Sequence, residues 1–345
     1  LLLLGGSWYL FAYESLLVDG LTPVVALFIL FVLLVYQKFA REQAQKKQVR
    51  GAFSQYLSPA LVEQLAEDPD RLVLGGETKN MTFLFCDIRG FTPISESFKG
   101  DPQGLTRLIN KFLTPMTDII MANHGTIDKY MGDCIMAFWN APRKHKLHAE
   151  QATLALFQFK QALEEINTSF VDLGFPAIDI GVGVNTGPCA VGAMGSKARL
   201  DYSCIGDAVN LSSRLEGITK QYGLWNCIGS STAAIVGHKF ALLQIDSVAV
   251  KGRTQPETIW TVVGESDVLS DPKYIELRRL VDEGINAYTS QRWDDAEAAY
   301  RAAGDIKMDA LDPAGLRDVF LERIAEYRAD PPPKDWDGVY IATSK

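Results

Sequence analysis

The sequence predicts an α+β domain with the order βαββαβ, preceded by apolar helices and followed by a small helical tail. Short apolar runs of strand length alternate with longer amphipathic stretches from residue 75 to residue 264. Gly20–Gln37 holds no charged residue and is long enough to approach the minimum for crossing a bilayer. From Asp271 the pattern changes and becomes mostly helical. We therefore divide the chain into 1–37, 38–74, 75–264 and 265–345.

The N-terminal division reads as two transmembrane helices, of which the first is truncated. Leu1–Tyr13 is as apolar as Gly20–Gln37, and the chain does not begin with Met, so we read it as a fragment of a longer protein. A buried core helix is the alternative reading of the second run. The basic residues that follow it predict that everything downstream lies in the cytoplasm; they are Lys38, Arg41, Lys46, Lys47 and Arg50.

The linker over residues 38–74 begins as a polar, helix-prone segment. It could continue the membrane helix as a two-stranded coil, but its heptad pattern is poor. A single amphipathic helix packed on the next domain is therefore an open alternative. Ser58 and Pro59 fit the N-cap and first position of a new helix.

The central division alternates strands and helices in an order that suits a ferredoxin-like sheet with helices on one face. The expected strands are Asn80–Cys86, Leu242–Val250 and Thr258–Val263, with hairpins over Gly125–Trp139 and Ile178–Val191, and the expected helices are Gln103–Asn123, His148–Leu173 and Asp207–Tyr222.

The tail has the small and aromatic spacing of one tetratricopeptide-like helix pair over Leu280–Ala303, with a further helix over Ala314–Arg328. One such unit cannot bury its own apolar face, so it must dock on the central domain or on a partner.

Composition excludes some functions. The net charge is −8, and the tail alone carries 18 acids against 11 bases, so the central domain is close to neutral. It offers no basic stripe for nucleic acid, and we expect no nucleic-acid partner. The five cysteines show no CxxC spacing and lie mostly in apolar runs, which predicts buried, reduced thiols.

Two segments carry the chemistry. Phe83–Thr92 reads FLFCDIRGFT, an apolar strand that ends at Asp87 and turns into a helix whose first amides can hold phosphate. Asp128–Phe138 reads DKYMGDCIMAF, a tight hairpin with Asp133 after Gly132. Two carboxylates at strand tips that meet in the fold would hold two hard cations beside a phosphate chain.

Two further motifs complete a pattern that resembles the class III nucleotidyl cyclase catalytic domain. They are RLDYSCIGDAVNLSSRLEG at residues 199–217 and VKGRTQP at residues 250–256. The resemblance covers residues 75–264. The apolar segment and short linker before it resemble, more weakly, bacterial membrane-bound cyclases with a CHASE sensor. This implies a protein of the cell inner membrane with its catalytic domain in the cytoplasm.

The resemblance implies that Asp87 and Asp133 bind two Mg²⁺ or Mn²⁺ ions per active site, with the backbone carbonyl of Ile88 as a further ligand. The amides of Gly90, Phe91 and Thr92 would face the phosphates.

It also assigns Asn210 to positioning the ribose and Arg214 to the reacting phosphate in the transition state. Their spacing places both on one helical face. Lys251 would bind the terminal phosphates, with Arg199 or Lys197 assisting.

By the same resemblance, Lys129 and Ser203 read the base. Lys129 donates to adenine N1, and Ser203 can accept from the adenine amine, whereas guanine N1–H would need an acceptor. Because Lys129 and Asp133 would serve different sites, the resemblance implies a homodimer with shared active sites.

The sequence therefore predicts a membrane-anchored adenylate cyclase that converts ATP to cyclic AMP and pyrophosphate in signal transduction. A guanylate cyclase is one alternative, which Lys129 disfavours. A catalytically inactive, cyclase-like dimeric regulatory module is the other, although no motif residue is lost.

Overall fold

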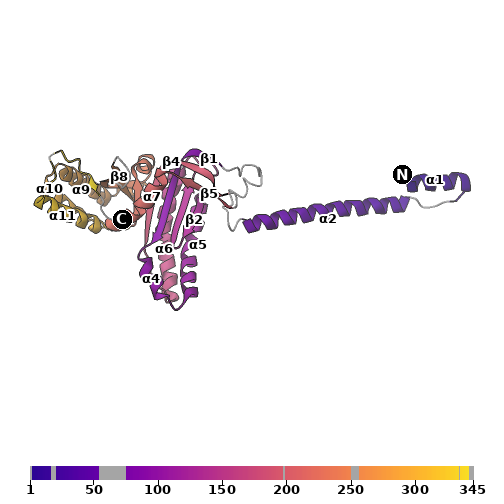
Figure 1. The fold of residues 1–345 in the computed structure, drawn as a ribbon, viewed down its shortest axis with the longest axis horizontal. Helices are drawn as coiled ribbons and strands as arrows, with labels where there is room; N and C mark the ends of the chain where they lie inside the picture. Colours follow the sequence, from indigo (N-terminus) through magenta and orange to yellow (C-terminus); the bar gives the residue numbers. More distant parts are fainter. Residues whose placement is uncertain are drawn as a thin grey trace. The chain divides into compact units, whose positions relative to one another are not determined.

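The computed structural model describes residues 2–16, 21–53, 75–196, 199–249, 256–333 and 335–341. They belong to two compact units, Leu1–Pro69 and Asp70–Lys345. Figure 1 draws both units, and each is described here by itself.

The first unit consists of α1 (Leu2–Glu14) and α2 (Leu21–Phe53). Among the described residues, Leu21–Arg41 is the one stretch of helix long and apolar enough to cross a membrane, and none of its apolar window is buried. The expected earlier membrane helix is represented by α1, which spans 13 residues. Helix α2 continues through the basic residues without a break, whereas Ser58 and Pro59 lie outside the described residues.

The second unit is built on one mixed sheet with the order β2-β3-β1-β4-β6-β8-β7-β9, and β5 pairs with β4 beside this path. Its first four strands are antiparallel neighbours, and with helices α5 and α6 they form the predicted βαββαβ unit. The strands are β1 (Gly75–Ile88), β2 (Thr126–Met131), β3 (Cys134–Trp139), β4 (Ile180–Ser196), β5 (Arg199–Ile205), β6 (Asn226–Gly229), β7 (Ala241–Ala249), β8 (Glu257–Gly264) and β9 (Tyr340–Ile341).

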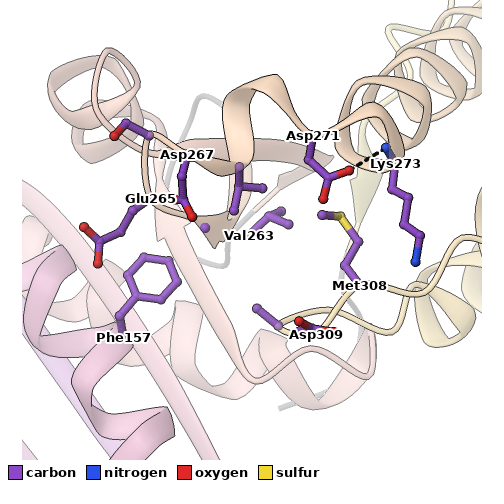
Figure 2. Close-up of a pocket in the computed structure, with 12 residues that line it drawn as sticks. Phe157, Val263, Glu265, Asp267, Asp271, Lys273, Met308 and Asp309 are labelled. Atoms are coloured by element: carbon purple, nitrogen blue, oxygen red, sulfur yellow. Dashed lines mark hydrogen bonds between the residues drawn. The ribbon is translucent and has the colours of Figure 1, made fainter.

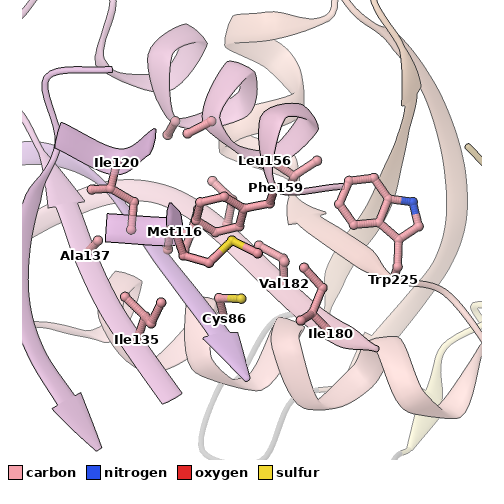
Figure 3. Packing of buried hydrophobic residues seen from close by; sticks show 14 of the residues in the cluster. Cys86, Met116, Ile120, Ile135, Ala137, Leu156, Phe159, Ile180, Val182 and Trp225 are labelled. Carbon is pink, nitrogen blue, oxygen red and sulfur yellow. The ribbon is translucent and has the colours of Figure 1, made fainter. Parts of the chain in front are cut away.

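One face of this sheet is covered by α5 (Pro102–Ala122) and α6 (His148–Asp172), with the short α4 (Phe91–Ser97) after β1. The apolar positions of both long helices recur at helical spacing and point toward the strands. Figure 3 shows Met116 and Phe159 from these helices packed over Cys86 and Val182 of the sheet. The predicted boundaries of both helices are confirmed to within about one residue.

The other face is covered by α7 (Asp207–Gln221) and β5. The expectation that helices cover only one face of the sheet is therefore wrong. A separate apolar cluster fills this side, with Phe83, Phe85 and Phe138 of the sheet packed against Val209 of α7 and Cys204 of β5. Strand β5 was missed, although polar and apolar residues alternate along its sequence, RLDYSCI, as far as Cys204.

The hairpin expected within Ile178–Val191 is wrong. Asn185, Thr186 and Gly187 resemble a turn, but they lie inside the continuous strand β4, which pairs with β1 along its length. The glycines of β4 serve packing instead: a Cβ at Gly183 would lie 2.2 Å from the carbonyl oxygen of Ser212 on α7. Only glycine lets that helix approach the strand so closely.

The tail folds as α9 (Pro272–Thr289), α10 (Trp293–Gly304) and α11 (Ala314–Ala329), after a short α8 (Ser230–Val236) and a 3₁₀ turn at Val268–Ser270. The predicted helix pair and third helix are confirmed. Their buried residues share one apolar cluster with α7, β7 and β8, so the tail docks on the central domain.

A buried ion pair lies at the centre of this docking. Arg323 of α11 donates to Asp246 of β7 at 2.5 Å and to the hydroxyl of Tyr222, which follows α7, at 2.9 Å. All five cysteines are free, and four of them are buried, as expected.

Candidate active site

The two predicted metal-binding acids meet at one end of the sheet. Asp87 stands near the end of β1, and Asp133 stands in the turn between β2 and β3. The backbone N–H of Ile88 donates to Asp133 Oδ2 at 3.3 Å. The fold therefore brings together two acids that have 45 residues between them in the sequence.

The burial and mutual repulsion of these two carboxylates favour the binding of a cation. Asp87 Oδ1 is buried and has no hydrogen-bond partner among the described residues. Burial raises the pKa of Asp133 to about 7, and both the hydrogen bond with Asp87 and the negative charge of Asp87 contribute to this shift. Burial and the charge of Asp87 also raise the pKa of Glu216 on α7 to about 7. Crowded carboxylates of this kind are relieved by a bound divalent ion.

Two residues of this corner were not singled out from the sequence. Arg89 donates to the carbonyl of Ile180 and the hydroxyl of Thr219, both at 3.0 Å, and also to the carbonyl of Leu224. It thereby ties the end of β1 to β4 and α7. Glu216 lies over Gly181, the β4 residue that pairs with Asp87. No local pattern marks either role, because their partners are remote in the sequence.

The donor set fits Mg²⁺ or Mn²⁺ bound together with a phosphate chain. It offers the carboxylates of Asp87 and Asp133, and the backbone carbonyl of Ile88 next to them. Among the described residues, no cluster of three or more acidic, histidine or cysteine side chains has the geometry to hold an ion by itself. Mg²⁺ is typically bound by one or two carboxylates, with substrate phosphates and water as its remaining ligands.

Helix α4 begins directly after β1. Gly90 has a φ of 63°, in the left-handed region that glycine enters without strain, and caps the helix. The amides of Phe91 and Thr92 therefore lie in the first turn, where a helix supplies no acceptor of its own. This is the local arrangement that the sequence predicted.

Helix α7 carries Asn210 and Arg214, and both are exposed. The opposite side of the helix is fixed to the sheet. There, the hydroxyl of Ser212 lies 2.9 Å from the carbonyl of Phe83 and 3.0 Å from that of Gly183. The two predicted catalytic side chains thus project from a helix that is anchored to the sheet.

The two predicted base-reading residues lie together at β2 and β5. Ser203 donates to Asp128 Oδ2 at 2.8 Å, and Lys129 Nζ lies 3.3 Å from Asp128 Oδ1. Asp128 stands in the DKYMGD motif but was assigned no role from the sequence. None of the described hydrogen bonds or ion pairs joins this group to Asp87 and Asp133.

The remaining predicted residues are less fully described. Lys251 and Lys197 lie outside the described residues. Arg199 is the first residue of β5, and its side chain lies outside the described part. Their predicted phosphate contacts stay predictions.

A pocket of about 750 Å³ lies elsewhere, at the junction of the central domain and the tail. Figure 2 shows Glu265, Asp267 and Asp271 around it, with Phe157 at its edge. None of the described site residues lines this pocket.

Comparison with known proteins agrees with the fold and the motifs. Residues 75–263, more than half of the 345-residue chain, match the family model described as the adenylate and guanylate cyclase catalytic domain. The chain is 35% identical over 221 residues to an adenylate cyclase of Anabaena cylindrica, covering 62% of this chain and 41% of that protein. It is 32% identical over 186 residues to adenylate cyclase 1 of Rhizobium meliloti, covering 54% of this chain and 28% of that protein. The chain thus spans less than half the length of these relatives.

Two solved structures share the fold at the same level of identity. The guanylyl cyclase Cya2 superposes with a TM-score of 0.52 at 32% identity, over 57% of this chain and 98% of that one. The adenylyl cyclase CyaB from P. aeruginosa superposes with a TM-score of 0.51 at 32% identity, over 55% and 96%. The two neighbours are named for different purine nucleotides. Overall similarity therefore does not identify the nucleotide that this chain uses, and the evidence must come from the side chains that would contact the base.

Proposed function

Since the chain belongs to the adenylate and guanylate cyclase catalytic domain family, we propose that it is an adenylate cyclase that converts ATP to 3′,5′-cyclic AMP and pyrophosphate. The observation that carries the proposal is the crowded acid pair of Asp87 and Asp133 with its unpartnered buried oxygen. An inactive, purely regulatory copy of the fold would have no need to keep two mutually repelling carboxylates at one strand end.

In this proposal Asp87, Asp133 and the Ile88 carbonyl hold two Mg²⁺ or Mn²⁺ ions. Such ions lower the pKa of a bound hydroxyl and neutralise a triphosphate. The backbone N–H groups at the start of α4 donate hydrogen bonds to the phosphate oxygens. Arg214 stabilises charge on the reacting phosphate, and Asn210 positions the ribose whose 3′-hydroxyl attacks the α-phosphorus. Lys251 contacts the terminal phosphates.

The base is read by Lys129 and Ser203. Lys129 offers only donors, which match the N1 acceptor of adenine and oppose the N1–H of guanine. A second candidate, guanylate cyclase, has the support of one structural neighbour named for that activity, but Lys129 opposes it.

We further propose that the active site is shared between two chains. One chain holds the acid pair and the base-reading group as two separate sets of contacts. A two-fold dimer would bring the acids of one chain to Lys129, Ser203, Asn210 and Arg214 of the other, and would form two equivalent sites.

The exposed apolar face of α2 and the basic residues after it support an inner-membrane anchor with the catalytic domain in the cytoplasm. Helix α2 would connect that anchor to the linker without interruption.

The test of activity is a turnover assay on the purified chain with ATP and GTP, each with Mg²⁺ and Mn²⁺. The proposal expects cyclic AMP from ATP, loss of activity on chelation, and at most weak use of GTP. Asp87→Ala or Asp133→Ala should lower turnover more than tenfold. Exposed Asp118→Ala on α5 removes one acid elsewhere and should not. Faster turnover of GTP than of ATP would favour the second candidate, and no turnover of either would favour a regulatory module.

The test of the shared site mixes two inactive variants, Asp87→Ala and Arg214→Ala. A mixed dimer would have one site with both lesions and one with none, so statistical mixing should restore about a quarter of wild-type activity. No recovery, with subunit exchange shown independently, would place each site within one chain.

A further inference from the structure

Asp128 is the extra residue of a β-bulge in strand β2. Across the hairpin, Ile127 pairs with Ala137 and Lys129 pairs with Met136, so Asp128 has no partner of its own. A bulge of this kind redirects a side chain that regular alternation would place elsewhere. The Asp128 side chain is 2% exposed, whereas that of the adjacent Lys129 is 45% exposed. The bulge thus allows two consecutive residues to serve one site, one buried and one at the surface.

The buried carboxylate gathers donors from two strands. Its Oδ2 accepts from the Ser203 hydroxyl at 2.8 Å and from the Cys204 thiol at 3.7 Å, both on β5. Its Oδ1 faces the Lys129 ammonium at 3.3 Å. Ser203 itself is buried, so the bond to Asp128 is sheltered from exchange with solvent.

A serine hydroxyl has one proton, and a carboxylate can only accept. The Ser203 proton is therefore committed to Asp128, and only lone pairs remain for a ligand. We propose that Asp128 is a positioning residue that fixes Ser203 as a pure hydrogen-bond acceptor and thereby makes the site select a 6-amino purine nucleotide against a 6-oxo one. This inference rests on the proposed function.

The pairing rules make the selection explicit. The 6-amino group of adenine donates, which suits a fixed acceptor, whereas the 6-oxo group of guanine or hypoxanthine accepts, which opposes one. A freely rotating hydroxyl would serve both, because it can turn its proton toward an oxo group. Ser203 alone therefore cannot discriminate at position 6, and Asp128 supplies the missing direction.

The competing explanation is that Asp128 only joins β2 to β5. A purely structural role would lower turnover of all nucleotides alike when Asp128 is replaced. A positioning role changes the ratio between two nucleotides, and it does so only while Ser203 is present.

The experiment measures kcat/KM of the full chain for ATP and for inosine triphosphate, whose base carries a 6-oxo group. Asp128→Ala and Asp128→Leu remove the acceptor, one leaving space and one filling it. Each should reduce the preference for ATP over inosine triphosphate by roughly 5- to 150-fold, the usual effect of one mispaired buried polar group. In a Ser203→Ala background, the same Asp128 substitutions should leave the preference unchanged, since no hydroxyl remains to be oriented.

Thr126→Val is the matched control. Thr126 is a buried residue of the same strand, and its hydroxyl donates to the carbonyl of Ala141 at 2.8 Å, away from the base-reading group. Its loss should leave the nucleotide ratio unchanged even if stability falls.

An unchanged ratio in both Asp128 variants would overturn the inference. So would an equal change in the presence and absence of Ser203, because Asp128 would then act through Lys129 or through the fold. Either result is distinct from failure of the proposed function, which would show as a wild-type chain that does not turn over ATP or that prefers GTP.

Discussion

Replacing Arg323 with methionine should destabilise the whole catalytic unit, although this residue lies in the tail. Its guanidinium is buried with Asp246, and both residues are about 5% exposed or less. The same group also donates to the Tyr222 hydroxyl and stacks 3.4 Å from the centre of the Tyr340 ring. Methionine keeps most of the packing but leaves Asp246 without its cation.

The size of the effect follows from burial. Removing one partner of a buried ion pair typically costs about 3–5 kcal/mol, because the other charge stays desolvated and unpaired. Typical domains are stable by about 5–15 kcal/mol, so the loss would be a large part of the total. Turnover should fall as well, since Tyr222 caps the helix that carries Asn210 and Arg214.

The assay is urea unfolding of the chain trimmed of residues 1–53, at two pH values. Burial already raises the pKa of Asp246, and losing Arg323 removes the charge that lowers it, so the pKa rises further. A carboxyl whose folded pKa exceeds its unfolded value binds a proton more readily in the folded state, so stability falls as pH rises. The destabilisation should therefore be smaller at pH 5 than at pH 8.

Arg301→Met is the control, because Arg301 pairs with Glu297 on the exposed surface of α10. It should leave the unfolding midpoint nearly unchanged. A loss below about 1 kcal/mol for Arg323→Met, or an equal loss at both pH values, would refute the reasoning that the tail is held by a desolvated charge.

Three other outcomes are expected. Gly183→Ala should lower turnover at least about tenfold, because the new methyl would lie 2.2 Å from the Ser212 carbonyl oxygen and push α7 off the sheet; normal turnover in a folded variant would contradict this. Metal titrations of the initial rate should show apparent Mg²⁺ affinity falling by up to about tenfold per pH unit below pH 7, because the pKa of Asp133 is about 7 and protons compete there; an affinity independent of pH would contradict this. Inserting one to three residues near Gln45, within the continuous α2, should change activity with a period set by the roughly 100° turn per helical residue; indifference to the number inserted would show that α2 is only an anchor.

The sequence by itself determined what depends on short-range pattern. The long helices, the β2–β3 hairpin and the strand that delivers Asp87 to its tip all follow from the spacing of apolar residues and from turn residues such as Gly132. The motifs likewise marked Asp133, Asn210 and Arg214, because an acid at the end of a strand, or two residues on one face of a helix, can be recognised from a few neighbouring residues.

The tertiary structure alone decided what depends on distant neighbours. The sequence of Asn185–Gly187 is typical of a turn, but pairing with β1 makes it part of a strand. The need for glycine at position 183 becomes evident only from the packing of α7 against β4. Asp128 looks like an ordinary turn-flanking acid, but the bulge and strand β5 make it the partner of Ser203 across 75 positions. A residue's local preference is encoded in its neighbours along the chain, whereas its burial and hydrogen-bond partners are set by segments that meet only in the folded protein.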